Sequence, residues 1–221
     1  PVCNAGATGP ENVLSERCLL CLSHSLGAQC SGVPLLSPAA PVHGAETCLR
    51  TTPMQAPRLK AGGRAFAQIS QYYPELVALR RDLHAHPELG FEEVYTAARV
   101  KEALKACGVD GVQDGIGRTG LVATIRGRST ASGAMVGLRA DMDALPMTEC
   151  NDFAWKSAKT GLMHACGHDG HTAMLVGAAR YLAATRNFDG TAVLIFQPGE
   201  EGLAGARAMM DYLVTSGRTR I

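Results

Sequence analysis

A thiol and several imidazole groups occur together in one short segment of the sequence. The segment MHACGHDGHT, residues 163–172, contains His164, Cys166, His168 and His171. Thiolate and imidazole groups bind divalent metals such as Zn, Mn, Co and Ni. A thiol beside an imidazole can also act as a nucleophile, and a thiol can form half of a disulfide. Core packing does not explain so many polar side chains in one segment, so we expect chemistry here.

Carboxylates that could complete a site lie in two other segments. RADMD contains Asp141 and Asp143, and QPGEE ends in Glu200 and Glu201. Because adjacent side chains at a strand end point in different directions, one of the two glutamates can bind a metal while the other faces the water that the metal polarises. That second carboxylate can act as a general base, and attack of the water on a carbonyl gives amide hydrolysis. Asp143 is suited to orienting a ligand or a bridging water.

A β–α–β unit is expected to bring the three segments together. Apolar patterning predicts strands at 134–140 and 191–197 and a helix at 171–185 between them. The carboxyl ends of parallel strands meet at one edge of a sheet, where α/β proteins bind ligands. The histidine-rich segment opens the connecting helix and reaches the same edge. One crevice is therefore expected to contain Asp141, Asp143, His164, Cys166, His168, Asp169, His171, Glu200 and Glu201.

The spacing of Cys166 and His168 requires an irregular backbone. On a regular helix, side chains two residues apart point about 200° apart, so they do not reach one ion. Gly167 and Gly170 make a loop plausible because glycine adopts conformations that other residues avoid.

The remaining ordered part is expected to be α/β, with a mixed, largely parallel sheet flanked by helices. One helix is predicted to start at Pro74, and another to end at Gly108. A further strand is predicted at 120–127, a long loop at 141–163 and a last helix at 204–214. The strand at 191–197 is almost wholly apolar, which is typical of a strand that is covered on both faces.

The amino-terminal part of the chain has a different character. Residues 1–64 are rich in small residues and proline without a period of 2 or 3.6, so we expect a disordered or non-native extension. The first methionine is Met54, and residues 1–53 are expected to lie outside the native coding sequence. Cys18 and Cys21 form a lone CxxC, which is a weak zinc signal without a second pair.

Composition excludes several classes of function. The chain has 221 residues and a net charge of +1, without the basic clusters that bind nucleic acid or a membrane surface. It lacks an apolar run of about 18 residues, as a membrane span would require. The scattered Cys107, Cys150 and Cys166 indicate reduced thiols, so we expect a cytoplasmic protein.

Two rival interpretations of the thiol stay open. Cys166 as a nucleophile would need a thiolate, which the neighbouring carboxylates disfavour, and would leave those carboxylates unexplained. A structural zinc site would be closed by four ligands and would leave Glu200 and Glu201 without a role.

The segment DLHAHPELGFEE, residues 82–93, is predicted to be structural. It reads as a helix end, a proline turn and the acidic start of the next helix, with contact of either histidine to substrate as the alternative. Its polar residues are His84, His86, Glu88, Glu92 and Glu93. Arg139 is expected to pair with nearby carboxylates.

Four motifs in order carry a resemblance to a known family. LRRDLHAHPELGFEE, GLRADMDALPM, MHACGHDGHTAMLVGAARYLA and VLIFQPGEEG resemble the metal-dependent amidohydrolases of the aminoacylase, hippurate hydrolase and auxin-conjugate hydrolase type. The resemblance runs from about Tyr73 to about Met210. It implies a metallopeptidase-like catalytic domain with an inserted dimerisation domain, hence a homodimer for the complete protein. It also implies hydrolysis of N-acyl amino acids or related small amides with two divalent ions per complete site.

Roles follow from the resemblance position by position. Cys166, His168 and Glu201 match the family's metal ligands, and Glu200 matches its general base. Asp143 matches the aspartate that supports the metal centre. Three further residues are expected to support the ligands or face the substrate: His171, Asp141 and Asp169. Asp141 occupies the position where other branches of the superfamily have a histidine.

The resemblance also implies that part of the site is missing. Family members continue beyond this point with further metal-binding histidines, whereas VTSGRTRI does not resemble their continuation. Residues 65–221 are therefore expected to be the amino-terminal portion of the catalytic domain, with one sheet edge unpaired. The alternative function is a catalytically inactive metal-binding fragment.

Overall fold

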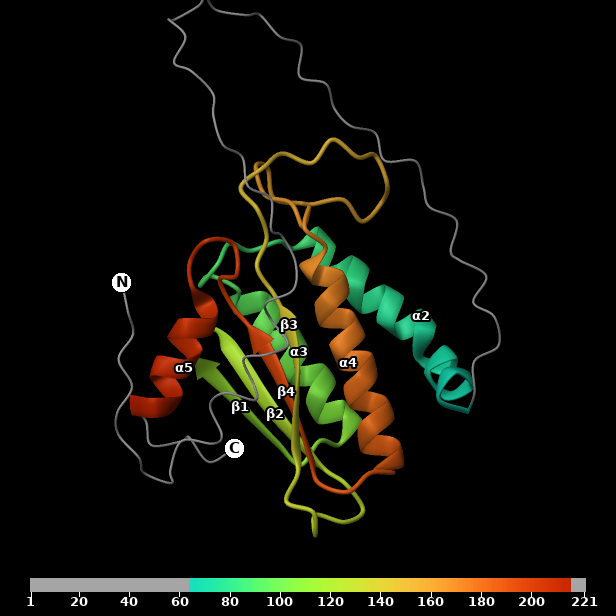
Figure 1. Ribbon diagram of the computed structural model, residues 1–221. Helices are drawn as coiled ribbons and strands as arrows, with labels where there is room; N and C mark the ends of the chain where they lie inside the picture. The colour runs from blue at the N-terminus through green and yellow to red at the C-terminus, as the bar shows by residue number, and fades with distance from the viewer. Residues whose placement is uncertain (1–63, 216–221) are drawn as a thin grey trace, which may run out of the picture. The chain divides into compact units, whose positions relative to one another are not determined.

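The computed structural model describes residues 64–215, which form a four-stranded sheet with four helices around it (Figure 1). The expectations for an amino-terminal extension and for the lone CxxC lie outside the described residues. In chain order the elements are α2 (Arg64–Ala85), α3 (Val94–Cys107), β1 (Gly111–Ile116), β2 (Gly120–Arg126), β3 (Met135–Asp141), α4 (His168–Thr185), β4 (Thr191–Gln197) and α5 (Gly205–Thr215).

The sheet is mixed, with strand order β1-β2-β4-β3. β3 and β4 run parallel and are joined through α4, as the β–α–β prediction requires. β2 pairs antiparallel with β1 and with β4, so the parallel part of the described sheet is confined to β3 and β4. β1 was not predicted, because GVQDGI lacks both an apolar run and a clear alternation.

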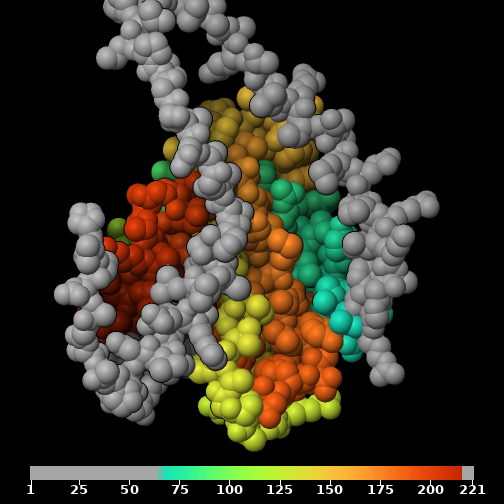
Figure 2. All heavy atoms as spheres, in the orientation of Figure 1, coloured from blue at the N-terminus to red at the C-terminus, as the bar shows by residue number. Residues whose placement is uncertain are grey.

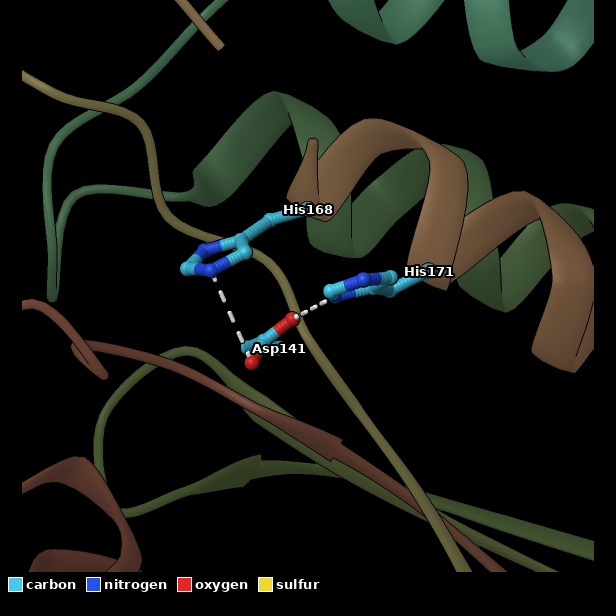
Figure 3. Close-up of side chains that lie close together, drawn as sticks. All are labelled: Asp141, His168 and His171. Atoms are coloured by element: carbon cyan, nitrogen blue, oxygen red, sulfur yellow. Dashed lines mark hydrogen bonds and ion pairs between the residues drawn. The ribbon is translucent and has the colours of Figure 1, made fainter. Parts of the chain in front are cut away.

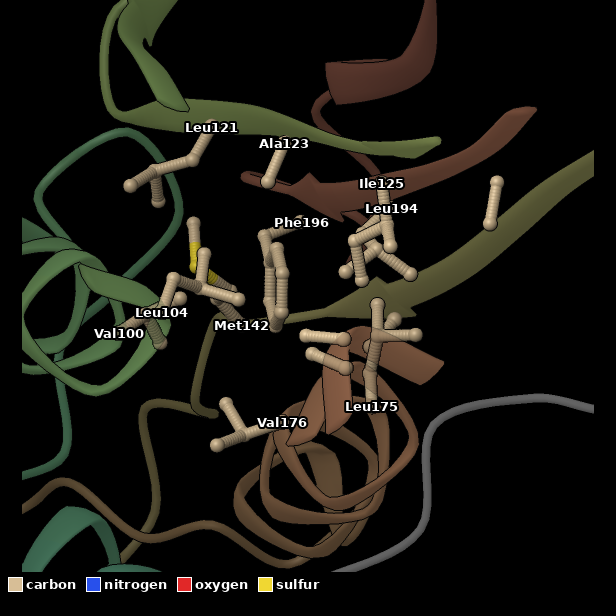
Figure 4. Close-up of a cluster of buried hydrophobic side chains, with 14 residues drawn as sticks. Val100, Leu104, Leu121, Ala123, Ile125, Met142, Leu175, Val176, Leu194 and Phe196 are labelled. Atoms are coloured by element: carbon tan, nitrogen blue, oxygen red, sulfur yellow. The ribbon is translucent and has the colours of Figure 1, made fainter. Parts of the chain in front are cut away.

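Helices lie on both faces of the sheet, and a core forms on each face. α2, α3 and α4 lie on one face, whereas α5 contacts β1 and β4 from the other (Figure 1). The larger core includes Leu121, Leu194 and Phe196, all fully buried (Figure 4). Burying each such side chain stabilises the fold by roughly 1.5–3 kcal/mol. Alternation along β2 sends Val122 to the smaller core under α5.

α2 is longer than predicted, and the expectation that it starts at Pro74 is wrong. The helix begins at Arg64, so Pro74 lies inside it on the exposed side. Proline fits helical φ and removes one N–H, but it does not determine on which side of it a helix begins. α2 and α4 pack against each other (Figure 2). Their contact is close, because a Cβ on Gly177 would lie 2.7 Å from Leu76 Cδ1.

The helix boundaries agree with the remaining sequence signals. Gly108 ends α3 in the left-handed conformation, with φ of 72°. α4 begins at His168, three residues before the predicted start. Among helices in residues 64–215, none is long and apolar enough to span a bilayer.

Candidate metal centre

The predicted site residues converge where β3 and β4 end and α4 begins. Asp141 is the last residue of β3, and His168 is the first residue of α4. Asp141 lies between two imidazoles (Figure 3): its Oδ1 is 2.7 Å from His171 Nδ1, and its Oδ2 is 3.6 Å from His168 Nε2. The β–α–β unit therefore places side chains from distant parts of the sequence at one sheet edge.

Two sets of possible donor atoms overlap at His168. Within each set, the ligand atoms all lie within 4.8 Å of one another. The first set is Cys166, His168 and Glu201, and the second is Asp141, His168 and His171. The first set contains the three residues that the sequence identifies as candidate ligands.

The backbone before α4 explains how Cys166 and His168 reach the same point. Gly167 adopts φ of 87° and precedes the first helical residue, so Cys166 lies off the helix. The predicted irregular backbone is thus provided by one glycine. The expectation of a similar role for Gly170 is wrong, because Gly170 lies in the first turn of α4.

Asp143 contacts both halves of the site. Its backbone carbonyl accepts a hydrogen bond from His168 Nδ1 at 2.9 Å, and its Oδ2 accepts one from the Glu201 N–H at 2.8 Å. Because a carbonyl oxygen only accepts, Nδ1 of His168 carries the hydrogen and Nε2 faces the other donor atoms. Burial raises the pKa of Asp143, but hydrogen bonds from His168 and from backbone N–H groups outweigh it and lower the pKa.

The thiol of Cys166 is poorly suited to nucleophilic attack in this arrangement. A hydrogen bond to Glu201, followed by burial and by the charges of Glu201, Glu200 and Asp141, raises the pKa of Cys166 to about 11. A thiolate nucleophile needs the opposite environment, with cations nearby. The same negative charge favours a divalent cation among these groups.

Buried acceptors without partners fit a cation at this point. Asp143 Oδ1 and Glu201 Oε1 are buried and accept no hydrogen bond of ordinary geometry; His168 Nδ1, 3.3 Å from Asp143 Oδ1, already donates to the Asp143 carbonyl oxygen. An unpartnered buried acceptor costs about 1–3 kcal/mol, and a metal ion would remove that cost. Thiol, imidazole and carboxylate together form a donor set for a borderline divalent ion.

Arg139 pairs with the carboxylates, as predicted. Its Nη1 lies 3.1 Å from Asp141 Oδ2, and its Nε donates to Gln197 Oε1 at 2.9 Å. Asp141 is therefore shared between Arg139 and His171.

Asp169 belongs to a buried network that sequence reasoning missed. Its Oδ2 accepts hydrogen bonds from His84 Nδ1 and Arg80 Nε, each at 2.7 Å. His84 Nε2 lies 3.1 Å from Glu149 Oε1 in the loop that follows β3. The imidazole thus joins α2 to the loop and to the first turn of α4. The signal available in the sequence was DLHAH, which the structural interpretation assigned only to a helix end.

The titration of His84 reflects its two carboxylate neighbours. Burial alone would lower the pKa of His84, but the hydrogen bonds to Asp169 and Glu149 outweigh it and raise the pKa. His164 shows the contrast: its ring nitrogens have no hydrogen-bond partner, and burial lowers its pKa to about 4.

Glu200 and Glu201 lie on the turn that follows β4, residues 198–204, called here the glutamate turn. Glu201 Oε1 is 3.9 Å and Glu200 Oε2 is 4.0 Å from His168 Nε2. The Glu200 side chain is 41% exposed and that of Glu201 28%. Both carboxylates face the imidazole, and Glu200 is the more open to water.

Comparisons with known proteins find similarity to a peptidase family and to hydrolases. Residues 137–220 match the model of peptidase family M20/M25/M40. Hippurate hydrolase of Campylobacter jejuni is 50% identical over 62% of this chain and 35% of its own length. IAA-amino acid hydrolase ILR1-like 2 of Arabidopsis thaliana is 44% identical over 66% of this chain and 33% of its own length.

A solved structure shares the fold. The Bacillus subtilis YXEP protein, described as a dinuclear metal-binding peptidase of family M20, is 41% identical, with a TM-score of 0.61 over 67% of this chain and 41% of that one. These matches confirm the resemblance to the metal-dependent amidohydrolases of the M20 family. The chain spans about a third of the length of the curated relatives it matches.

Proposed function

We propose that this chain forms part of a metal-dependent amidohydrolase that cleaves the amide bond of N-acyl amino acids or related small amides. The observation that carries the proposal is the donor set Cys166, His168 and Glu201, with Glu200 adjacent on the water-facing side. Hippurate hydrolase, IAA-amino acid hydrolase and N-acetylcysteine deacetylase among the relatives support this substrate class.

Different side chains would bind the metal and transfer the proton. Cys166, His168 and Glu201 would bind the metal, and a complete site would hold two divalent ions; Mn, Zn, Co and Ni all fit the donor types. A bound divalent ion lowers the pKa of a water and polarises a carbonyl oxygen. Glu200 would take the proton from the attacking water and deliver it to the leaving amine.

Supporting roles follow from the contacts. Asp143 would fix the position of His168 relative to the glutamate turn, because its carbonyl oxygen binds His168 and its carboxylate binds the Glu201 N–H. Asp141 and His171 would support the ligands or face the substrate, whereas Asp169 would act through His84 and the start of α4.

The wider proposals concern the complete protein. We infer that residues 65–221 are the amino-terminal portion of a catalytic domain and that the complete enzyme is a cytoplasmic homodimer. We infer that the complete enzyme binds its small-molecule substrate and binds neither nucleic acid nor a membrane.

Turnover by the purified chain tests the proposal. The chain would be loaded with Mn²⁺ or Zn²⁺ and offered N-acetyl and N-benzoyl amino acids. We expect Glu200→Gln to lower kcat by about 10²–10⁴-fold, the range for loss of a general base. Glu102→Gln, an exposed glutamate on α3, is the matched control and should leave turnover unchanged.

Two outcomes of this experiment would favour a different function. Metal binding without turnover by this chain would favour the inactive metal-binding alternative. Turnover that survives Glu200→Gln but is lost on alkylation of Cys166 in the metal-loaded chain would favour the cysteine nucleophile.

A further inference from the structure

The backbone of the segment Gly90–Glu93 lies directly against the glutamate turn. A Cβ added to Gly90 would lie 2.8 Å from Gly199 Cα and 2.5 Å from Leu203 Cδ1. The same Cβ would lie 3.4 Å from Asp143 Oδ2, the atom that holds the Glu201 N–H. Only glycine permits so close an approach of two backbones.

Phe91 is held in an unusual conformation at this contact. Its φ is 67°, in the left-handed region that bulky residues avoid. Gly199 also has positive φ, 56°, and a Cβ there would meet the Phe91 ring at 3.2 Å. Such conformations persist where the surrounding structure over-determines them, which is common beside functional sites.

Glu93 ties the segment to the turn by hydrogen bonds. Its side chain is fully buried, its Oε1 accepts the Gly199 N–H at 2.8 Å, and its Oε2 accepts a hydrogen bond from Thr119 Oγ1. Gly199 immediately precedes Glu200. The backbone on either side of Glu200 is therefore held by a buried carboxylate, by Glu93 at Gly199 and by Asp143 at Glu201.

We propose that Glu93 is a positioning residue that sets the glutamate turn, and so aims Glu200 and Glu201 at the ion held by Cys166 and His168. The inference rests on the proposed function of that site. It assigns a role to the GFEE motif, which the sequence interpretation treated as the acidic start of a helix. Residues that orient ligands in this way typically change metal affinity by about 10–100-fold.

The shape of Glu93 matters in this account, and its charge does not. Burial raises the pKa of Glu93 despite hydrogen bonds that oppose the shift. A glutamine at this position keeps an oxygen for the Gly199 N–H and an amide group that can donate to the Thr119 hydroxyl. An aspartate keeps the charge but is one methylene too short to reach both partners.

Co²⁺ binding by the full chain tests the proposal, followed through the thiolate-to-cobalt charge-transfer absorption from Cys166. We expect Glu93→Asp to weaken Co²⁺ binding by about 10–100-fold and to change the ligand-field spectrum. Glu93→Gln should bind within a few-fold of wild type. Glu92→Asp is the matched control, because Glu92 is exposed and adjacent, and it should bind as wild type does.

The other outcomes are distinct. If Glu93→Gln loses Co²⁺ binding and Glu93→Asp keeps it, the charge of Glu93 matters and not its reach. If both variants bind Co²⁺ as wild type does, the role of Glu93 is purely structural. Either result overturns the proposal that Glu93 positions the turn. If the wild-type chain fails to bind Co²⁺, the proposed metal site itself fails and this inference falls with it. If Glu93→Asp does not fold, Thr119→Val replaces it, because it removes the side-chain donor that holds the carboxylate.

Discussion

The two halves of the candidate metal centre are built differently. The cysteine–histidine half lies at the start of α4, where the His168 side chain is 4% exposed and the helix packs into the main core. The glutamate half lies on a turn after β4, with Glu200 41% exposed. Core packing fixes His168, and the exposed Cys166 is placed by the backbone just before the helix; in the second half, the turn is held by hydrogen bonds that Glu93 and Asp143 accept.

This difference matches the tasks that we propose for each half. A ligand that is held before the ion arrives costs little reorganisation on binding. A general base needs contact with water and must be aimed at it, so it is better placed on an open turn. Changes in the glutamate half should therefore alter metal geometry at little cost in stability, while changes in the cysteine–histidine half should alter both.

Asp143 joins the halves, so its loss should have the largest effect on stability. Asp143→Ala removes the acceptor of the Glu201 N–H and the carboxylate beside His168. We expect a loss of roughly 2–4 kcal/mol in the free energy of unfolding, because the Glu201 N–H loses its acceptor and the buried His168 imidazole loses the carboxylate charge beside it, while its hydrogen bond to the backbone carbonyl of residue 143 remains. Urea unfolding measures it, with exposed Asp152→Ala as the control. A loss no greater than that of the control would show that the halves are not joined through Asp143.

His84→Gln should weaken the cysteine–histidine half in a pH-dependent way. Because the folded pKa of His84 is raised, its stabilising contribution is present below about pH 6.5 and is lost as pH rises through the folded pKa. The pKa values of Asp169 and Glu149 are lowered, so their contribution is lost only as pH falls below about 4. The variant should cost about 2 kcal/mol near pH 6 and less at pH 9.

The measurement for His84 is urea unfolding at both pH values. The charged and titratable groups around the imidazole are Asp169, Glu149, Arg80 and His164, and each remains in the variant. His86→Gln is the control, because His86 is half-exposed, lies just after the end of α2 and bonds to Asp82 of that helix. An equal loss at both pH values would contradict the charge-dependent account.

Gly167→Ala should give the smallest loss of stability of these variants, and it should differ from Gly133→Ala, the matched glycine variant, in Co²⁺ affinity. Gly167 and Gly133 both have positive φ, 87° and 62°, with nothing within 4 Å of an added Cβ. Each alanine variant should therefore cost about 1–2 kcal/mol through backbone strain alone. Only Gly167→Ala should also weaken Co²⁺ binding, because Gly167 separates Cys166 from His168. Equal Co²⁺ affinity in the two variants would show that the conformation of Gly167 does not place the thiol.

The meeting of RADMD, CGHD and QPGEE at one edge was predictable because local patterns determine it. The apolar strand TAVLIFQ and the helix before it indicate a β–α–β unit, and that unit dictates which strand ends meet. The roles assigned to single residues at that edge, from Cys166 to Glu201, stay predictions.

The contacts of His84 and Glu93 were not predictable, because they depend on long-range packing. An acidic pair before a helix ordinarily faces water, and nothing local distinguishes buried Glu93 from exposed Glu92. Likewise, Asp169 lies 85 residues from His84 along the chain. Such pairs become visible only once α2 is placed against α4.

Co²⁺ titration of Glu200→Gln and Glu201→Gln tests the central claim most directly, because it compares two adjacent carboxylates with separate tasks. The account predicts that Glu201→Gln loses Co²⁺ affinity by at least about 10-fold and that Glu200→Gln retains the wild-type affinity and charge-transfer band. Equal affinities in the two variants, or the loss of binding in Glu200→Gln alone, would contradict the assignment of one glutamate to the metal and the other to the proton.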